Sequence, residues 1–191
     1  MLKLVINSIW AGLMISIGAV TYLNCPSQIA GAFLFSIGLS AILMLRFNLY
    51  TGLVGNAKNL RSIPELMVVI LGNAIGAFFS AAFAPDNAIS LWQTKLNKPL
   101  DVVFIQSIVC GILMYIAVYA YKKLPVGNNL VVMMLAVASF ILSGAEHSIA
   151  DMCFMFAARA MSFTSLGFIM VVIAGNTLGS IILGAWMRHR G

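Results

Sequence analysis

Charged residues are the class that this sequence has least of. Of its 191 residues, 8% are charged and only five are Asp or Glu, whereas 62% are hydrophobic. An ordinary globular protein has roughly 25% charged residues. A soluble fold of this length could not keep so much apolar surface out of water. The composition therefore excludes an ordinary soluble domain and predicts a protein embedded in a lipid bilayer.

Cysteine is also too scarce to build a site. Cys25, Cys110 and Cys153 are odd in number and widely spaced, without a CxxC pair. Such a pattern favours neither a disulfide framework nor a metal centre. We expect three small packed side chains, and we predict no metal and no cofactor.

Basic residues give the chain a formal net charge of +6. They stand singly at the ends of apolar runs, so we interpret them as orientation signals and expect no nucleic-acid partner. The richer side of the membrane would hold Lys3, Lys58, Arg61, Lys122, Lys123, Arg188 and Arg190, against Lys95, Lys98 and Arg159 on the other side. By the positive-inside rule the richer side, with both termini, is cytoplasmic.

Six apolar segments are long enough to cross a bilayer, which takes about 20 residues. They fall at about residues 4–23, 29–53, 64–83, 102–121, 129–156 and 165–186. The sequence thus predicts an all-α integral membrane protein with six transmembrane helices in one domain over residues 1–191.

The third and sixth of these segments share a Gly-Asn-x-x-Gly element. It comprises Gly72, Asn73 and Gly76, and again Gly175, Asn176 and Gly179. The recurrence indicates two repeats, over about residues 1–88 and 98–191, and three crossings in each would make the repeats run oppositely through the membrane. The glycines could instead serve close helix packing alone, but a buried Asn needs hydrogen-bond partners.

Polar residues interrupt the second and fifth segments. The stretch "LRFNLYTGLVGN" contains Arg46 and Thr51, and "SGAEHSIADM" contains Glu146, His147 and Asp151. Irregular backbone at membrane depth is tolerated where it is buried in protein or lines a wet cavity. We therefore expect helices two and five to be broken, with their half-helix ends directed at one site near the midplane.

His147 is the leading functional candidate, because imidazole exchanges a proton near neutral pH and ionisable residues inside a membrane are usually functional. The alternative is a satisfied core histidine. Glu146, Asp151 and Arg46 are interpreted as structural. Glu146 could accept hydrogen bonds from exposed amides, and Asp151 could cap the returning half-helix or pair with Arg46. Arg46 could instead extend toward the cytoplasm.

These stretches resemble the formate/nitrite transporter family of pentameric, aquaporin-like channels over nearly the whole chain. "SGAEHSIADM" resembles the signature around the family's central histidine, and "FSIGLSAILMLRFNLYTG" resembles the segment leading to its Leu-Phe-Thr loop, here Leu49, Tyr50 and Thr51. The chain departs from the family pattern at Arg46, Tyr115 and Asp151, where Gly, Asn and Asn are usual.

The resemblance implies a homopentamer in a prokaryotic inner membrane that carries small monovalent weak-acid anions: formate, nitrite, hydrosulfide or short carboxylates. Thr51 and His147, with Asn73 and Asn176, would lie on the pathway, and Lys98 would concentrate anions at the vestibule. The apolar constrictions would be formed by Phe35, Leu39, Leu49, Tyr50 and Phe140. A bare anion loses too much hydration there, and protonation would let a neutral acid pass.

Three alternatives remain. A channel for water, glycerol or urea is the first, although the paired Asn-Pro-Ala motifs of aquaporins are absent. An intramembrane enzyme built on His147 lacks a convincing nucleophile or an HExxH motif, and we expect no enzyme. A scaffold without transport would leave Thr51, His147 and the interrupted helices unexplained.

Overall fold

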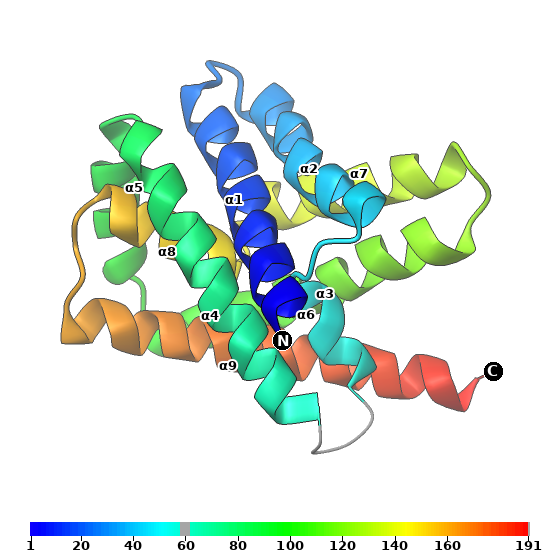
Figure 1. The fold of residues 1–191 in the computed structure, drawn as a ribbon. Coiled ribbons are helices and arrows are strands. Elements are labelled where there is room, and N and C mark those ends of the chain that lie inside the picture. Colours follow the sequence, from blue (N-terminus) through cyan, green and yellow to red (C-terminus); the bar gives the residue numbers. More distant parts are fainter. Residues whose placement is uncertain (58–61, 191) are drawn as a thin grey trace.

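The computed structural model describes residues 1–57 and 62–190, and these residues are helical or lie in short connections. Lys58 and Arg61, which we place on the cytoplasmic side, lie outside the described residues. In chain order the α-helices are α1 Leu2–Asn24, α2 Gln28–Leu45, α3 Tyr50–Leu53, α4 Ile63–Ser80, α5 Asn87–Leu96, α6 Leu100–Lys123, α7 Asn128–Leu142, α8 Ser148–Ala157 and α9 Phe163–His189 (Figure 1).

Five segments are long and apolar enough to cross a membrane: α1, α2, α4 with the short turn that follows it, α6 and α9. Side-chain caps fix two of their starts, because Ser27 accepts a hydrogen bond from the Ala30 amide and Ser162 from the Ser165 amide. Large apolar side chains remain exposed on the outer surface, for example Leu71 (61%) and Phe79 (62%) on α4. Such a surface suits lipid and not water.

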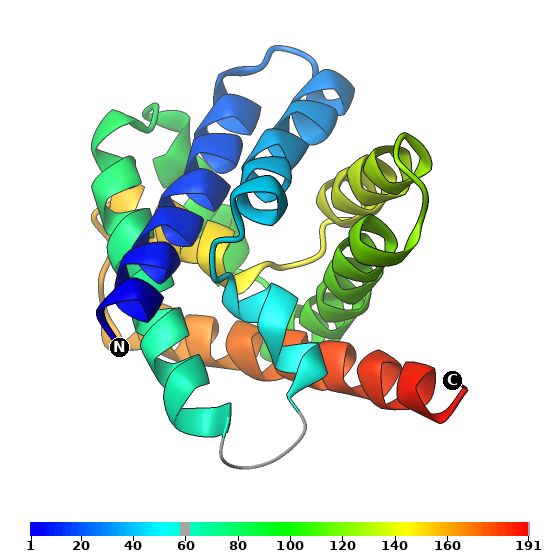
Figure 2. The same cartoon turned by 45° about the vertical axis from the view of Figure 1, so that its right-hand side comes forward.

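The second and fifth apolar segments are interrupted where the sequence predicts it. Helix α2 ends at Leu45, and Arg46 takes a left-handed conformation with φ of 58°. Helix α7 ends at Leu142, and Gly144 has φ of 70°. The chain then begins the short helices α3 and α8, whose first turns meet near the centre of the molecule (Figure 2).

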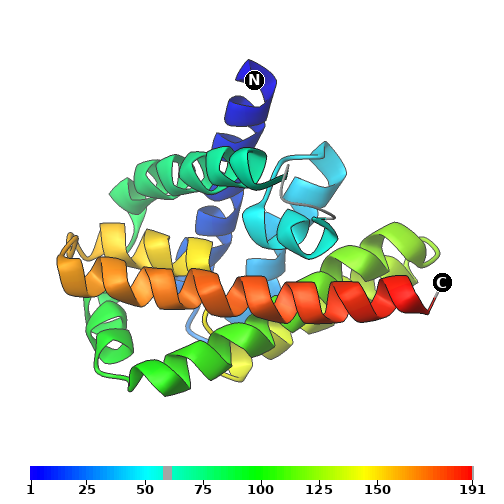
Figure 3. The same ribbon diagram turned by 90° about the horizontal axis from the view of Figure 1, so that it is seen from below.

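The same close contacts recur in the two halves of the chain. Helix α4 packs along α1 and α9 packs along α6, and these are the two most extensive helix pairs. Figure 3 shows α9 as one long helix running across the molecule beside α6. A Cβ atom at Gly76 would collide with the carbonyl oxygen of Ile9, and one at Gly179 with that of Ile108. The glycines of both Gly-Asn elements therefore let backbones touch.

Helix α5 is absent from the sequence prediction, which places no element between residues 83 and 102. It is short and half polar, so it lacks the long apolar run that marks a span. Its Trp92 is fully buried, with its ring centroid 5.3 Å from that of Phe168. Helix α5 thereby lies against α8 and α9 and carries Lys95 into the protein.

Gly179→Ala is expected to destabilise the protein, because the added methyl group overlaps the Ile108 carbonyl, and such overpacking costs about 1–3 kcal/mol. Gly167→Ala, on the same helix, is the matched control, since a Cβ there has no atom within 4 Å among the described residues. Thermal unfolding of the purified variants in detergent measures the difference. Equal melting temperatures for the two variants would contradict the close packing of α6 and α9.

Candidate functional site

His147 and Thr51 form the polar centre where the two interrupted helices meet. Both side chains are buried, and Nε2 of His147 lies 3.0 Å from Oγ1 of Thr51. The other ring nitrogen, Nδ1, accepts a hydrogen bond from the Ala150 amide at 3.3 Å, so His147 is the N-cap of α8. In the neutral ring Nδ1 is therefore the acceptor, and Nε2 carries the proton and donates it to Thr51.

Two asparagines hold the backbone of the interruptions. The Asn73 side chain donates to the carbonyls of Ser8 (2.7 Å) and Asn48 (2.9 Å) and accepts from the Tyr50 amide (2.9 Å). Leu49, between Asn48 and Tyr50, is thereby fixed in position. Since one amide side chain replaces the partners that a continuous helix would supply, the interruption has no need of water at these groups.

Asn176 repeats this pattern in the second half. It donates to the carbonyls of Ser107 (2.9 Å) and Glu146 (2.8 Å) and accepts from the Ser148 amide (2.9 Å). We expect Asn73 and Asn176 on the pathway, and in the structure neither lines the two cavities described below. Their hydrogen bonds go to backbone, so they position the chain beside Leu49 and His147.

Two cavities lie on either side of this centre. The Arg46 cavity, about 420 Å³, is lined by Leu39, Leu49, Gly52 and Lys122 among others. The His147 cavity, about 220 Å³, is lined by Phe35, Phe140, His147, Lys95, Lys98 and Asp151 among others. Thr51 is buried next to Gly52, and its partner is His147. His147 thus lines one cavity, and its partner Thr51 is the neighbour in sequence of Gly52, which lines the other.

The residues expected to form constrictions are buried in the same region. The rings of Phe35 and Phe140 meet edge to face, with centroids 5.6 Å apart, and Phe140 stacks on His147 at 5.7 Å. Leu39 and Leu49 are 1% and 2% exposed. Tyr50 is buried, and its hydroxyl lies 2.7 Å from that of Thr177. Apolar groups therefore surround the polar centre on the side of each cavity.

A cluster of two lysines and two carboxylates stands beside His147; we call it the lysine–carboxylate cluster, comprising Lys95, Lys98, Glu146 and Asp151. Lys95 contacts Oε2 of Glu146, and its Nζ lies 2.9 Å from Oδ1 of Asp151. Lys98 donates to Oε1 of Glu146 at 2.6 Å and to Gln106 at 3.0 Å. Both carboxylates are buried, at 0% and 1% exposure, and so require these partners.

The structure differs from three of the roles expected for these residues from the sequence. Asp151 pairs with Lys95 and not with Arg46, and the cap of α8 is His147 and not Asp151. Glu146 binds lysine ammonium groups in place of backbone amides. Burial by itself would lower the pKa of Lys95, but the charges of Asp151 and Glu146 outweigh it and raise this pKa above its ordinary value. The two carboxylates therefore favour the ammonium form of Lys95.

Lys98 is among the site residues expected from the sequence, whereas Lys95 is not. A signal for it was available, because two carboxylates inside a membrane need cations, and only Lys95, Lys98 and Arg159 were assigned to that side. The helix that brings Lys95 inward was missing from the prediction, so the pairing was missing as well.

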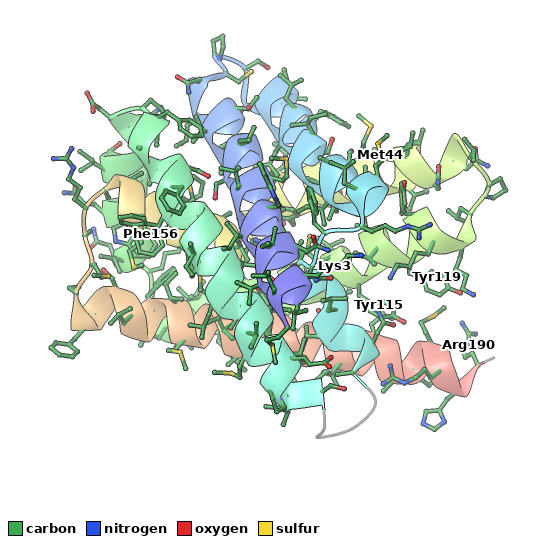
Figure 4. All side chains as sticks on the ribbon, viewed as in Figure 1. Lys3, Met44, Tyr115, Tyr119, Phe156 and Arg190 are labelled. Carbon is green, nitrogen blue, oxygen red and sulfur yellow. The ribbon has the colours of Figure 1, made fainter. Side chains whose placement is uncertain are left out.

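Two of the departures from the family pattern lie away from the polar centre. Arg46 ends α2 and lines the Arg46 cavity beside Lys122. Tyr115 packs against Gly55 and Gly184 and stacks on Tyr119, with centroids 6.1 Å apart. Figure 4 shows both labelled tyrosines close together on α6. Only Asp151 changes the surroundings of His147. No group of three or more His, Cys, Asp and Glu suited to a metal occurs in the described part of the chain.

Comparison with known proteins adds independent information. The family model described as "Formate/nitrite transporter" matches residues 1–190. The chain is 31% identical over 153 residues to the "Uncharacterized transporter YwcJ" of Bacillus subtilis, an alignment covering 75% of this chain and 58% of that protein. It is 26% identical over 178 residues to the "Formate channel FocA" of Haemophilus influenzae, covering 76% and 63%. The chain thus spans about three fifths of the length of these curated relatives.

Solved structures share the fold. An "FNT family ion channel" superposes with a TM-score of 0.86 at 22% identity, over 98% of this chain and 90% of that chain. A "Pentameric formate channel with formate bound" superposes with a TM-score of 0.81 at 22% identity, over 97% and 95%. The match of the family model over residues 1–190 establishes that the chain belongs to the formate/nitrite transporter family of integral membrane proteins.

Proposed function

We propose that the protein is a channel for small monovalent anions of weak acids, formate first among them, which pass the polar centre in protonated form. The observation that carries this proposal is the hydrogen-bonded pair of His147 and Thr51 between two cavities, with apolar side chains on both sides. FocA and one similar solved structure are named as formate channels. Nitrite, hydrosulfide and short carboxylates belong to the same chemical class.

The proposed architecture has six crossings: α1, α2 with α3, α4, α6, α7 with α8, and α9. They form two inverted three-helix repeats over about residues 1–88 and 98–191, aquaporin-like, in one domain. The equivalent hydrogen bonds of Asn73 and Asn176 support this assignment. The protein would lie in the inner membrane of a prokaryotic cell, with both termini on the cytoplasmic side. A homopentamer is proposed because one similar solved structure is described as pentameric.

The mechanism follows from desolvation and hydrogen bonding. An anion that reaches the constriction formed by Phe35 and Phe140 loses its water, and the apolar rings offer no hydrogen bond in its place. At the polar centre, the Thr51 hydroxyl accepts the Nε2 proton of His147, so its own proton is free for an oxygen or sulfur atom of the permeant. Protonation of the permeant there removes its charge and lowers the barrier at the next apolar side chain.

His147 is best suited to orient this step. Its Nδ1 already accepts the Ala150 amide, so a second proton on the ring would place two donors face to face. This geometry favours a ring that donates through Nε2, with the proton of the acid arriving from water in a cavity.

The other candidate functions fit the site less well. A channel for neutral solutes has no use for the four buried or half-buried charges beside His147. An enzyme built on His147 needs a free base, but both ring nitrogens are engaged, one by Thr51 and one by Ala150. Transport of a weak acid gives a role both to the charges beside His147 and to its hydrogen bond with Thr51.

Radiolabelled formate and nitrite uptake into liposomes containing the purified protein tests the proposal, with hydrosulfide followed by a sulfide electrode. We expect formate flux to rise roughly tenfold or more between external pH 7.5 and pH 5, because the undissociated acid becomes more abundant. Protein-free liposomes give the background. Rapid glycerol or urea equilibration without flux of any of the three anions would support the neutral-solute channel instead.

His147→Asn is expected to lower formate flux about tenfold or more, since the permeant loses a hydrogen-bonding centre while the new side chain can still cap α8. Thr51→Val is expected to act in the same direction, and Thr51→Ser, which keeps the hydroxyl, should retain most of the flux. Wild-type flux with unchanged pH dependence in both His147→Asn and Thr51→Val would exclude the proposed centre.

A further inference from the structure

The lysine–carboxylate cluster has no net charge. Its two ammonium groups, on Lys95 and Lys98, are matched by the carboxylates of Glu146 and Asp151. Among the described residues that line the His147 cavity, Lys95, Lys98 and Asp151 are the charged ones, and Glu146 contacts both lysines. The side chains beside this cavity therefore carry no excess positive charge, whereas Lys98 alone would give the cavity a positive charge that attracts anions.

Asp151 has one carboxylate oxygen to spare. Its Oδ1 lies 2.9 Å from Nζ of Lys95, whereas its Oδ2 is buried and has no hydrogen-bond partner within residues 1–57 and 62–190. Buried polar atoms are nearly always hydrogen-bonded, and an unpaired one is costly. Asp151 is 1% exposed and lines the His147 cavity. Asp151 thus places a carboxylate in the wall of this cavity, with one oxygen that has no partner among the described residues.

We propose that Asp151 is a specificity-determining residue, which makes the His147 cavity select the protonated, donor-bearing form of the permeant over its bare anion. This rests on the proposed function. A bare carboxylate has acceptors only, so Oδ2 of Asp151 repels it. The undissociated acid brings one O–H donor to Asp151 and keeps a carbonyl oxygen as an acceptor for the Thr51 hydroxyl.

The same geometry excludes a second class of anion. Nitrate and chloride stay unprotonated at the pH values of a cell, and they have no donor for Asp151. The neutral cluster gives them no attraction to offset the loss of hydration. Asp151 therefore adds a second selection to that of the apolar constriction, because it favours permeants that can take up a proton and donate it.

Asp151→Asn is the sharpest test, because it keeps the size of the side chain, turns the spare acceptor into an amide donor and leaves the cluster with an excess positive charge. We expect initial formate uptake into liposomes at pH 7.5 to rise about tenfold, so that the ratio of flux at pH 5 to flux at pH 7.5 falls. We also expect nitrate to inhibit the variant and to leave the wild type unaffected. Asp101→Asn is the matched control, since it makes the same charge change at an exposed position on α6.

If folded Asp151→Asn keeps the wild-type flux ratio and resists nitrate, or if Asp101→Asn changes as much, the inference is wrong. If Asp151→Asn does not fold, Lys98→Met shifts the cluster charge the other way with Asp151 intact. It is expected to raise the flux ratio, and an unchanged ratio overturns the inference. Absence of wild-type formate flux at both pH values would overturn the proposed function itself.

Discussion

Backbone hydrogen bonding at the two interruptions is the constraint on which the rest of the structure depends. A helix that breaks at membrane depth leaves carbonyl and amide groups without partners, and lipid cannot supply them. Asn73 and Asn176 each supply three hydrogen bonds, one to a neighbouring helix and two to the interruption. Each amide reaches the neighbouring helix because glycines such as Gly76 and Gly179 let the backbones touch. The glycines and the asparagines therefore act together, because the close packing allowed by the glycines is needed for the hydrogen bonds of the asparagines.

The two asparagines also give Leu49 and His147 equivalent backbone surroundings. Asn73 bonds the backbone on either side of Leu49, and Asn176 bonds the backbone on either side of His147. The same backbone arrangement thus presents an apolar side chain from one half and an imidazole from the other. Only the second can exchange hydrogen bonds with Thr51. The two interruptions therefore share one backbone arrangement and differ in the side chain that it presents.

Local patterns explain how much of this fold can be predicted from the sequence. The apolar runs mark every long helix, because lipid demands apolar surface over a fixed length. The polar stretches mark both interruptions, and the repeated Gly-Asn element marks the two helices that carry the asparagines. Helix α5 could not be found this way, since ten residues with a half-polar surface resemble a loop. What the amides of Asn73 and Asn176 bind also depends on contacts between distant segments.

The partner of Asp151 cannot be predicted from the sequence for a related reason. Arg46 and Lys95 are both cations separated from Asp151 by many residues, and the sequence alone does not say which helix carries its cation inward. The structure decides for Lys95, because Trp92 anchors α5 against Phe168. A lysine with a long flexible side chain then spans the remaining gap. Charge pairing in a membrane predicts that a partner exists, but packing determines which one it is.

Helix α5 makes the two cavities electrostatically different. It lies at the junction of the proposed repeats, so its lysine has no counterpart on the other side of the polar centre. Among the described residues that line the Arg46 cavity, the charged ones are Arg46 and Lys122, both positive. The His147 cavity instead holds a balanced cluster. Under the proposed function, an anion would be attracted to the Arg46 cavity by the charges of Arg46 and Lys122. At the His147 cavity it would meet paired charges and would need to carry a proton. The asymmetry lies in charge balance and not in the backbone, which is alike in the two halves.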